Sequence, residues 1–213
     1  MFFKNRQDAG RKLASELKEY KDRKDVQVLG LARGGVIVAY EVAKALELPL
    51  NIVIPRKIGA PGNPELAIGA ITETGAGVLN ENIIARLGVS QAYIEQAIHK
   101  EKEEAQRRIK LYRKYAPLVN LEEKTVILVD DGIATGATMQ AAVKSVQAEN
   151  ASYVIVAVPV ASRDAIEILE RMADKIVSLY SPADFGAVGY FYEYFDQAED
   201  SEILDLLCKT RIR

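Results

Sequence analysis

The stretch Val126-Ile-Leu-Val-Asp-Asp-Gly-Ile-Ala-Thr-Gly-Ala-Thr138 decides the fold of this chain. Four apolar residues lead directly to two adjacent carboxylates, and small residues follow before an apolar helical pattern begins at Met139. This order predicts a buried strand, an acidic tip at its carboxyl end and a loop that opens a helix. Small loop residues let backbone N–H groups close around a phosphate, and a helix N-terminus adds partial positive charge. We therefore predict a phosphate site here, with Asp130 and Asp131 placed to accept hydrogen bonds from sugar hydroxyls.

This acidic segment resembles the 5-phosphoribosyl-1-diphosphate (PRPP) binding motif of the type I phosphoribosyltransferases. The resemblance implies that the two carboxylates contact the ribose hydroxyls. It also implies that the loop holds the 5-phosphate, through Gly132, Ala134, Thr135, Gly136, Ala137 and Thr138. A Walker-type phosphate loop is excluded because no Gly-Lys-Ser/Thr closes the segment. A plain strand-to-helix turn with two solvated aspartates is the alternative interpretation.

The composition narrows the class of protein. The chain has 213 residues, of which 49% are hydrophobic and 27% charged, and its formal net charge is −2. This balance argues against a protein that coats nucleic acid. A single cysteine, Cys208, excludes an internal disulfide and fits a reducing compartment. Since we find neither a signal-peptide pattern nor an apolar run long enough to span a membrane, we expect a cytoplasmic protein without membrane or nucleic-acid partners.

Strand and helix patterns alternate along most of the chain. This alternation predicts an α/β fold, with a mostly parallel sheet flanked by helices. We expect core strands at 26–31, 50–54, 125–129, 153–158 and 176–180, and helices at 7–20, 36–46, 137–149 and 163–173. Residues 67–71 and 77–79 read as a short hairpin around 73–75. The resemblance to phosphoribosyltransferases extends over most of the chain, so we expect one domain of that type across residues 1–213.

A long helix interrupts the alternation. Residues 90–115 form one continuous helical pattern, with Ser90 as the predicted N-cap, inside an insertion at about 82–118. Its apolar stripe is narrow, and charged residues cover the remaining faces. The helix either covers a flank of the sheet or packs against a second copy in a homodimer. Both interpretations stay open.

Two further segments bring cations to the expected site. Ala32-Arg-Gly-Gly35 follows a predicted strand, and arginine grips phosphate oxygens with paired hydrogen bonds. By resemblance, Ala32, Arg33, Gly34 and Gly35 form the loop that receives the diphosphate. The Gly- and Pro-rich segment 55–64 resembles the mobile loop that closes over the active site in that family, with Arg56 and Lys57 as further diphosphate contacts. An ordinary surface loop with two solvated cations is the alternative.

Aromatic residues, sparse elsewhere, gather near the C-terminus. The resemblance implies a small hood at about 181–213, where Phe185, Tyr190 or Tyr192 could stack on a planar nucleophile. Packing of these rings against the core is the alternative. Taken together, the segments resemble a subgroup of phosphoribosyltransferases whose substrate is undefined.

The resemblance implies transfer of a 5-phosphoribosyl group from PRPP to a nitrogen nucleophile, with Mg²⁺ bound mainly through PRPP. Asp130, Asp131, Arg33 and Lys57 are the expected catalytic residues. The nucleophile is not identified by the sequence. A non-catalytic PRPP or nucleotide sensor on the same fold is the main alternative, and the basic cluster within residues 107–114 is the feature that favours it. A hydrolase or phosphorylase of a ribose phosphate shares the same phosphate loop and stays open.

Overall fold

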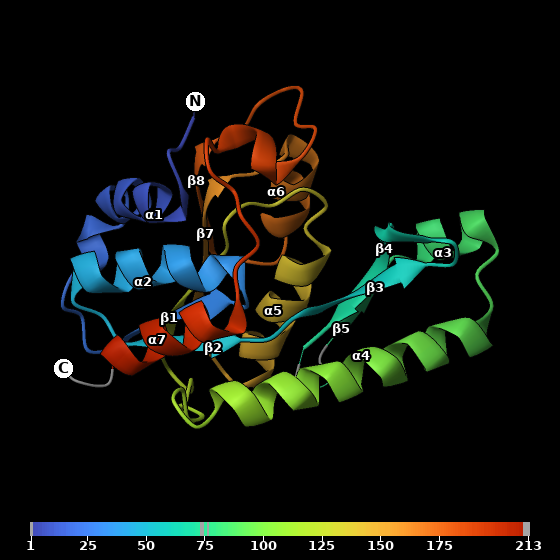
Figure 1. The fold of residues 1–213 in the computed structure, drawn as a ribbon, viewed down its shortest axis with the longest axis horizontal. Coiled ribbons are helices and arrows are strands. Elements are labelled where there is room, and N and C mark those ends of the chain that lie inside the picture. Colours follow the sequence, from blue (N-terminus) through green and yellow to red (C-terminus); the bar gives the residue numbers. More distant parts are fainter. Residues whose placement is uncertain (1, 73–74, 76, 211–213) are drawn as a thin grey trace.

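The computed structural model describes residues 2–72, 75 and 77–210, and it contains two sheets (Figure 1). The larger sheet has five parallel strands in the order β2-β1-β6-β7-β8. Its strands are β1 (Val26–Leu31), β2 (Leu50–Val53), β6 (Thr125–Val129), β7 (Tyr153–Val160) and β8 (Lys175–Tyr180). Every residue of β1 and β6 is buried, as in a parallel sheet that is covered on both faces. The predicted α/β fold is confirmed.

Helices cover both faces of this sheet. They are α1 (Arg6–Ser15) and α2 (Gly34–Leu46) on one face, and α5 (Ala137–Ala148) and α6 (Arg163–Leu169) on the other. Neighbouring residues of a strand point to opposite faces. Thus Val28 and Ile127 pack under α1 and α2, whereas Leu29 and Leu128 pack under α5 and α6. This two-sided burial holds the strand ends in fixed positions at the carboxyl edge of the sheet.

The second sheet is antiparallel and projects from the first as an arm (Figure 1). It consists of β3 (Arg56–Ala60), β4 (Asn63–Ile71) and β5 (Gly77–Leu79), followed by α3 (Glu81–Leu87) and α4 (Gln91–Tyr112). The arm has an apolar cluster of its own, made by Ile58, Ala60, Ile68, Ile71, Ile84 and Ile94. The strands of the arm also pack against α5, so the arm is joined to the main body as well as to its own cluster.

Segment 55–64 is the main place where the predicted local structure was wrong. We predicted a loop, but the segment forms β3 and the beginning of β4. Gly59 lies so close to the Pro64 backbone that a Cβ there would be 2.7 Å from the Pro64 Cα, and the strand register shifts at this point. Glycine and proline are therefore part of an irregular hairpin here, and not of a loop. The 67–71 and 77–79 hairpin is confirmed, while its turn residues Glu73 and Thr74 lie outside the described residues.

Helix α4 both covers the arm and reaches the main body. Ser90 caps it as predicted, with its side chain accepting a hydrogen bond from the Tyr93 N–H. At the other end Tyr112 is fully buried beside α2 and β2. Arg113, just beyond, donates to the Asn51 side chain at 3.1 Å. The helix therefore connects the arm to the edge of the parallel sheet.

The segment before α1 pairs with residues 191–194 near the carboxyl edge of the sheet. The Phe3 N–H donates to the Phe191 carbonyl, and the Glu193 N–H donates to the Phe3 carbonyl, each at 2.8 Å. The C-terminal elements are the 3-10 helix η2 (Val188–Phe191) and α7 (Asp200–Thr210). Two predicted helices are shorter than expected, because 7–20 divides into α1 and the 3-10 helix η1 (Lys18–Tyr20) and 163–173 ends at Leu169. Within the described part of the chain, no helix combines the length and apolarity needed to cross a membrane.

Candidate active site

Asp130 and Asp131 lie directly after β6, where a ligand of an open parallel sheet is expected. The Asp130 carboxylate accepts a hydrogen bond from the Asp131 N–H at 2.8 Å. The Asp131 carboxylate accepts one from Arg6 Nε at 2.7 Å. Arg6 also donates from Nη1 to the Asp196 carbonyl and lies 3.9 Å from the centre of the Phe195 ring. The first helix thus supplies a cation that sequence reasoning did not identify.

The acidic pair packs directly against the glycines of the Arg33-Gly-Gly35 segment. A Cβ at Gly34 would collide with the Asp131 carboxylate. At Gly35 it would lie 2.7 Å from both Asp130 Oδ1 and the Val129 carbonyl oxygen. Both positions therefore require glycine because of this close approach. The two motifs recognised separately in the sequence form one site, with the carboxylates at the first turn of α2.

Both carboxyl groups have pKa values above the ordinary aspartate value. Burial is the main cause for each, since it disfavours the charged form. The charge of Asp131 raises the pKa of Asp130 further. At Asp131 the Arg6 guanidinium opposes the effect of burial on the pKa. Hydrogen-bond donors or a cation would stabilise the charged form of these two adjacent carboxyl groups.

The loop after the acidic pair is fixed to the neighbouring strand. The Ile133 N–H donates to the Val160 carbonyl at 2.9 Å, and the Ser162 hydroxyl donates to the Ala134 carbonyl at 2.6 Å. Gly136 precedes α5 with φ +79°, a left-handed conformation that favours glycine. Ala134 and Thr135 are exposed at the loop tip. Because the first N–H groups of a helix have no carbonyl partner within it, the start of α5 is suited to a phosphate.

Arg33 lies at the start of α2, after a cis Ala32–Arg33 peptide bond. Its Nη1 is 3.7 Å from Oδ1 of Asp200, the first residue of α7. The same carboxylate oxygen accepts a hydrogen bond from the Tyr112 hydroxyl of α4. The cation predicted for the diphosphate is therefore close to the site, and it has an acidic neighbour that the sequence pattern did not reveal.

Arg56 and Lys57 lie on β3 of the arm, not in a loop. The Arg56 guanidinium donates to Oε2 of Glu101 on α4, at 2.8 Å from Nε and 2.7 Å from Nη2. Lys57 is the next residue of the strand, so its side chain leaves the opposite face of the arm. Arg56 therefore helps to pack β3 against α4.

The predicted hood residues occupy three different environments. Tyr192 is only 6% exposed, packs against Phe3 and Phe195, and donates its hydroxyl to the Asp131 carbonyl at 2.5 Å. Its ring is therefore packed against the core, the alternative that the sequence left open, and it offers no open stacking surface because both neighbours cover it. Phe185 is partly buried against Phe191. Tyr190 is 71% exposed, which leaves its ring accessible to a planar molecule.

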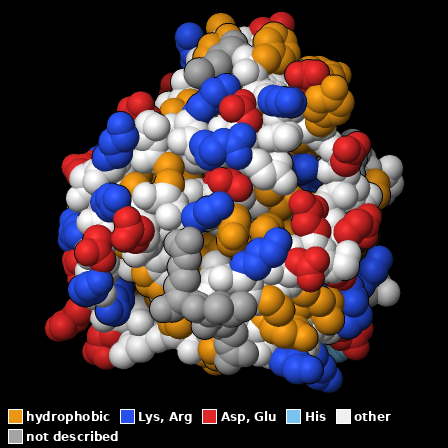
Figure 2. All heavy atoms as spheres, turned by 60° about the vertical axis from the view of Figure 1, so that its left-hand side comes forward, with side chains coloured by type: hydrophobic (Ala, Val, Ile, Leu, Met, Phe, Trp, Pro, Cys, Tyr) orange, Lys and Arg blue, Asp and Glu red, His pale blue; other side chains and the backbone are white. Residues whose placement is uncertain are grey.

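The basic cluster on α4 is largely engaged within the protein. Arg107 and Arg108 both donate to Glu104, and Arg113 donates to Asn51 and to the Ala116 carbonyl. On the side where α1, α2 and α7 lie, Figure 2 shows basic and acidic side chains interspersed. This distribution does not resemble the continuous basic surface that nucleic-acid binding requires.

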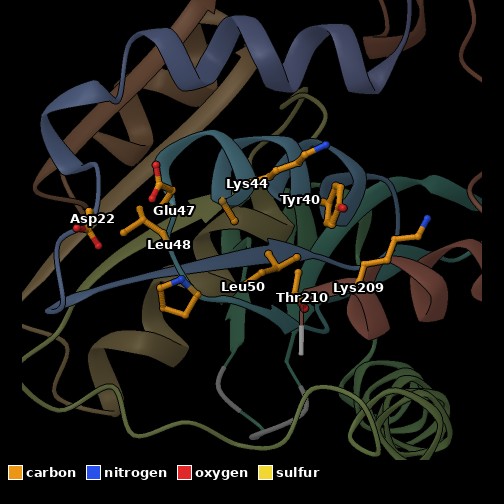
Figure 3. Close-up of a pocket in the computed structure, with 10 residues that line it drawn as sticks. Asp22, Tyr40, Lys44, Glu47, Leu48, Leu50, Lys209 and Thr210 are labelled. Carbon is orange, nitrogen blue, oxygen red and sulfur yellow. The ribbon is translucent and has the colours of Figure 1, made fainter. Parts of the chain in front are cut away.

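A cavity of about 400 Å³ lies away from the acidic pair (Figure 3). It is lined by the ends of α2 and α7 and by Leu48, Pro49 and Leu50, at the point where β2 begins. Ligands of parallel α/β sheets bind at the opposite, carboxyl edge. The acidic pair, rather than this cavity, is therefore the candidate active site.

Comparison with known proteins agrees with this site. A family model described as the phosphoribosyl transferase domain matches residues 3–193, which include both glycine-containing loops and the acidic pair. The chain belongs to this family. The type I phosphoribosyltransferase resemblance drawn from the sequence is thereby confirmed.

Relatives of the chain come from different bacteria. It is 42% identical over 205 residues to "Putative phosphoribosyl transferase Rv0571c" of Mycobacterium tuberculosis, covering 96% of this chain and 46% of that protein. The chain thus spans about half the length of the curated relatives it matches. The crystal structure of TT1426 from Thermus thermophilus is 41% identical, with a TM-score of 0.81 over 98% of this chain and 99% of that one. AQ2163 of Aquifex aeolicus, at 12% identity and a TM-score of 0.50 over 83% and 74% of the two chains, shares the fold alone.

Proposed function

We propose that this protein transfers the 5-phosphoribosyl group of PRPP to a nitrogenous base or a similar nucleophile and releases diphosphate. The observation that carries the proposal is the packing of Asp130 and Asp131 against Gly34 and Gly35, beside the α5 N-terminus. This packing brings together the acidic pair, which would bind the ribose, the loop that would hold the 5-phosphate, and the Arg33 loop, at one edge of the sheet. Membership of the phosphoribosyl transferase domain family supports the same reaction class.

In the proposed reaction, the bond between ribose C1 and the diphosphate oxygen breaks, and its electron pair leaves with the diphosphate. The nucleophile's nitrogen lone pair forms the new bond to C1, and the nitrogen then releases its proton. Positive charge develops on the ribose and negative charge on the leaving group. Catalysis would thus depend on positioning and electrostatics, with Asp130 and Asp131 orienting the ribose and Arg33 and Lys57 stabilising the diphosphate.

The side chains fit Mg²⁺ that arrives with PRPP. Among the described residues there is no group of three or more histidine, cysteine or acidic side chains that could hold a metal ion. Mg²⁺ commonly uses one or two carboxylates together with substrate phosphates and water, and the acidic pair could supply such carboxylates. Bound Mg²⁺ would offset the charge of the diphosphate. Asp131, already bonded to Arg6, would retain its orientation toward the ribose.

The test is calorimetric titration of PRPP in the presence of Mg²⁺, followed by measurement of diphosphate release with a panel of free bases. PRPP binding and base-dependent diphosphate release are expected. A matched control is Asp164→Asn, which removes an exposed carboxylate on α6 and should leave both signals unchanged.

The same assay distinguishes the proposed transferase from the alternative, a non-catalytic PRPP sensor. Tight PRPP binding without diphosphate release across purine, pyrimidine and other nitrogen nucleophiles would replace the transferase proposal with a PRPP-sensing role. Absence of PRPP binding would contradict both, and ribose 5-phosphate hydrolysis would then be assayed for the third alternative.

A further inference from the structure

Helix α7 reaches the candidate active site although it lies beyond residues 3–193, the part that matches the family model. Ile203 and Leu207 are fully buried against α2 and β2 residues such as Val36 and Ile52. Burying two such side chains contributes several kcal/mol, about 1.5–3 each. The start of α7 is therefore held in place and does not behave as a loose segment over the site.

The anchored helix presents Asp200 to the diphosphate loop. One carboxylate oxygen accepts the Tyr112 hydroxyl and lies 3.7 Å from Arg33 Nη1. The other lies 4.0 Å from Arg107 Nη2. The Asp200 side chain is 29% exposed and that of Arg33 is 22% exposed, so water screens this pair only in part. The carboxylate consequently reduces the positive potential that Arg33 offers to an anion.

Two other arginines described above are also paired with carboxylates. Arg6 is paired with Asp131, and Arg56 is paired with Glu101. Asp131 belongs to the ribose-binding pair and Glu101 to the packing of the arm. Asp200 is not part of the acidic pair, and it contacts α4 through Tyr112 and Arg107. Its charge can therefore be removed without altering the acidic pair, provided that the Tyr112 hydroxyl keeps an acceptor.

We propose that Asp200, acting through Arg33, keeps the affinity of the Arg33 loop for diphosphate low. The proposal rests on the function proposed above, because it assigns the Arg33 loop to the diphosphate. A carboxylate near the terminal phosphates weakens binding of the diphosphate end and leaves the ribose 5-phosphate end unaffected. In a transferase this would favour release of the diphosphate product after transfer.

The experiment compares wild type, Asp200→Asn and Asp205→Asn by titration with inorganic diphosphate and, separately, with ribose 5-phosphate. Asparagine keeps an acceptor for the Tyr112 hydroxyl but removes the charge. Asp205, exposed on the same helix, is the control for a change in net charge. For Asp200→Asn we expect diphosphate binding about five- to tenfold tighter at low salt, shrinking at high salt. Ribose 5-phosphate affinity should stay within about twofold, since the 5-phosphate loop lies at another helix N-terminus.

A double-mutant comparison tests whether the effect runs through Arg33. In an Arg33→Ala background, Asp200→Asn should give no gain in diphosphate affinity. A gain that persists there, or an equal gain with Asp205→Asn, would overturn the proposal. Unchanged diphosphate binding by Asp200→Asn would also overturn it, and weaker binding would do so by showing that the carboxylate supports Arg33. Asp200→Ser provides a second neutral variant should the asparagine variant fold poorly.

The outcomes separate this inference from the proposed function. Wild type that binds diphosphate but neither PRPP nor ribose 5-phosphate would contradict the proposed transferase, while the Asp200 comparison would still decide the inference. Wild type that binds PRPP but shows no gain on Asp200→Asn would contradict the inference alone. Wild type that binds none of the three ligands would contradict both.

Discussion

Acidic residues at the edge of the parallel sheet and on the arm differ in the direction of their pKa shifts. Burial raises the pKa of Asp130 and of Asp131 at the edge. On α4 of the arm, the hydrogen bond from Arg107 outweighs burial and lowers the pKa of Glu104 to about 2. Ionisation of the two edge aspartates therefore lowers the free energy of unfolding, whereas ionisation of Glu104 on the arm raises it. This difference supports the proposed ligand-binding role of the edge carboxylates.

The largest expected effect is on ligand binding at the edge. Asp131→Asn removes the charge that accepts a hydrogen bond from Arg6 and would orient the ribose. Charged hydrogen bonds contribute about 1.5–3 kcal/mol, so PRPP affinity should fall by about 10- to 150-fold. Calorimetry with Mg²⁺ measures this loss, with Asp164→Asn as the control. Unchanged affinity would show that the acidic pair does not contact the ligand.

The next effect concerns packing at the edge. Gly34→Ala places a methyl group against the Asp131 carboxylate. Such overpacking costs about 1–3 kcal/mol of unfolding free energy, measurable by urea denaturation. Because the collision is with the carboxylate, the loss should shrink in an Asp131→Ala background. An equal loss in both backgrounds would locate the strain elsewhere.

Neutralising Asp130 should stabilise the unliganded protein. The pKa of Asp130 is higher in the folded than in the unfolded protein. The folded wild type is therefore stabilised while this carboxyl is protonated, and it loses that stability as pH rises through the folded pKa. Asp130→Asn should therefore raise Tm at pH 7, by about 2–4 °C for each kcal/mol gained. The gain should disappear toward pH 3, where the wild-type carboxyl is protonated in both states. A lower Tm at pH 7 would contradict this account of the edge.

The smallest effect is expected on the arm, and it has the opposite sign. Glu104→Gln removes a partly exposed pair with Arg107, so stability at pH 7 should fall by about 0.5 kcal/mol. The lowered pKa means that this contribution is present above about pH 4.5 and is lost as pH falls toward about 2. Urea denaturation at several pH values measures it. The control Glu103→Gln, an exposed carboxylate on the same helix, should change little.

The sequence predicted most of the elements because their patterns are local. Strands β1 and β6 have the predicted bounds, since each is a mostly apolar run with polar or small residues on either side. The 55–64 segment was predicted wrongly because glycine and proline are common to loops and to irregular hairpins. Only the approach of Gly59 to Pro64 distinguishes these two, and a composition pattern does not contain it.

The site was predicted in part for the same reason. The acidic pair and the Arg33 loop each follow a strand and have a local signature. Arg6 and Asp200 have none, because their partners are distant in the chain, with Arg6 and Asp131 125 positions apart and Tyr112 and Asp200 88 apart. A lone arginine in an N-terminal helix resembles any solvated cation until the fold places a carboxylate beside it.

Helix α4 also has a mechanical consequence. Its 22 residues span about 33 Å, with the carboxyl end fastened at Tyr112 and Asn51 and the amino end at the far tip of the arm (Figure 1). A rotation of about 5° at the fastened end would move the tip by about 3 Å. Because β4 and β5 also pack against α5, such a rotation would shift these contacts as well. A pair of fluorescent labels, one near Ser90 and one on the main body, would turn a rearrangement beside Arg33 into a distance change that can be followed in real time.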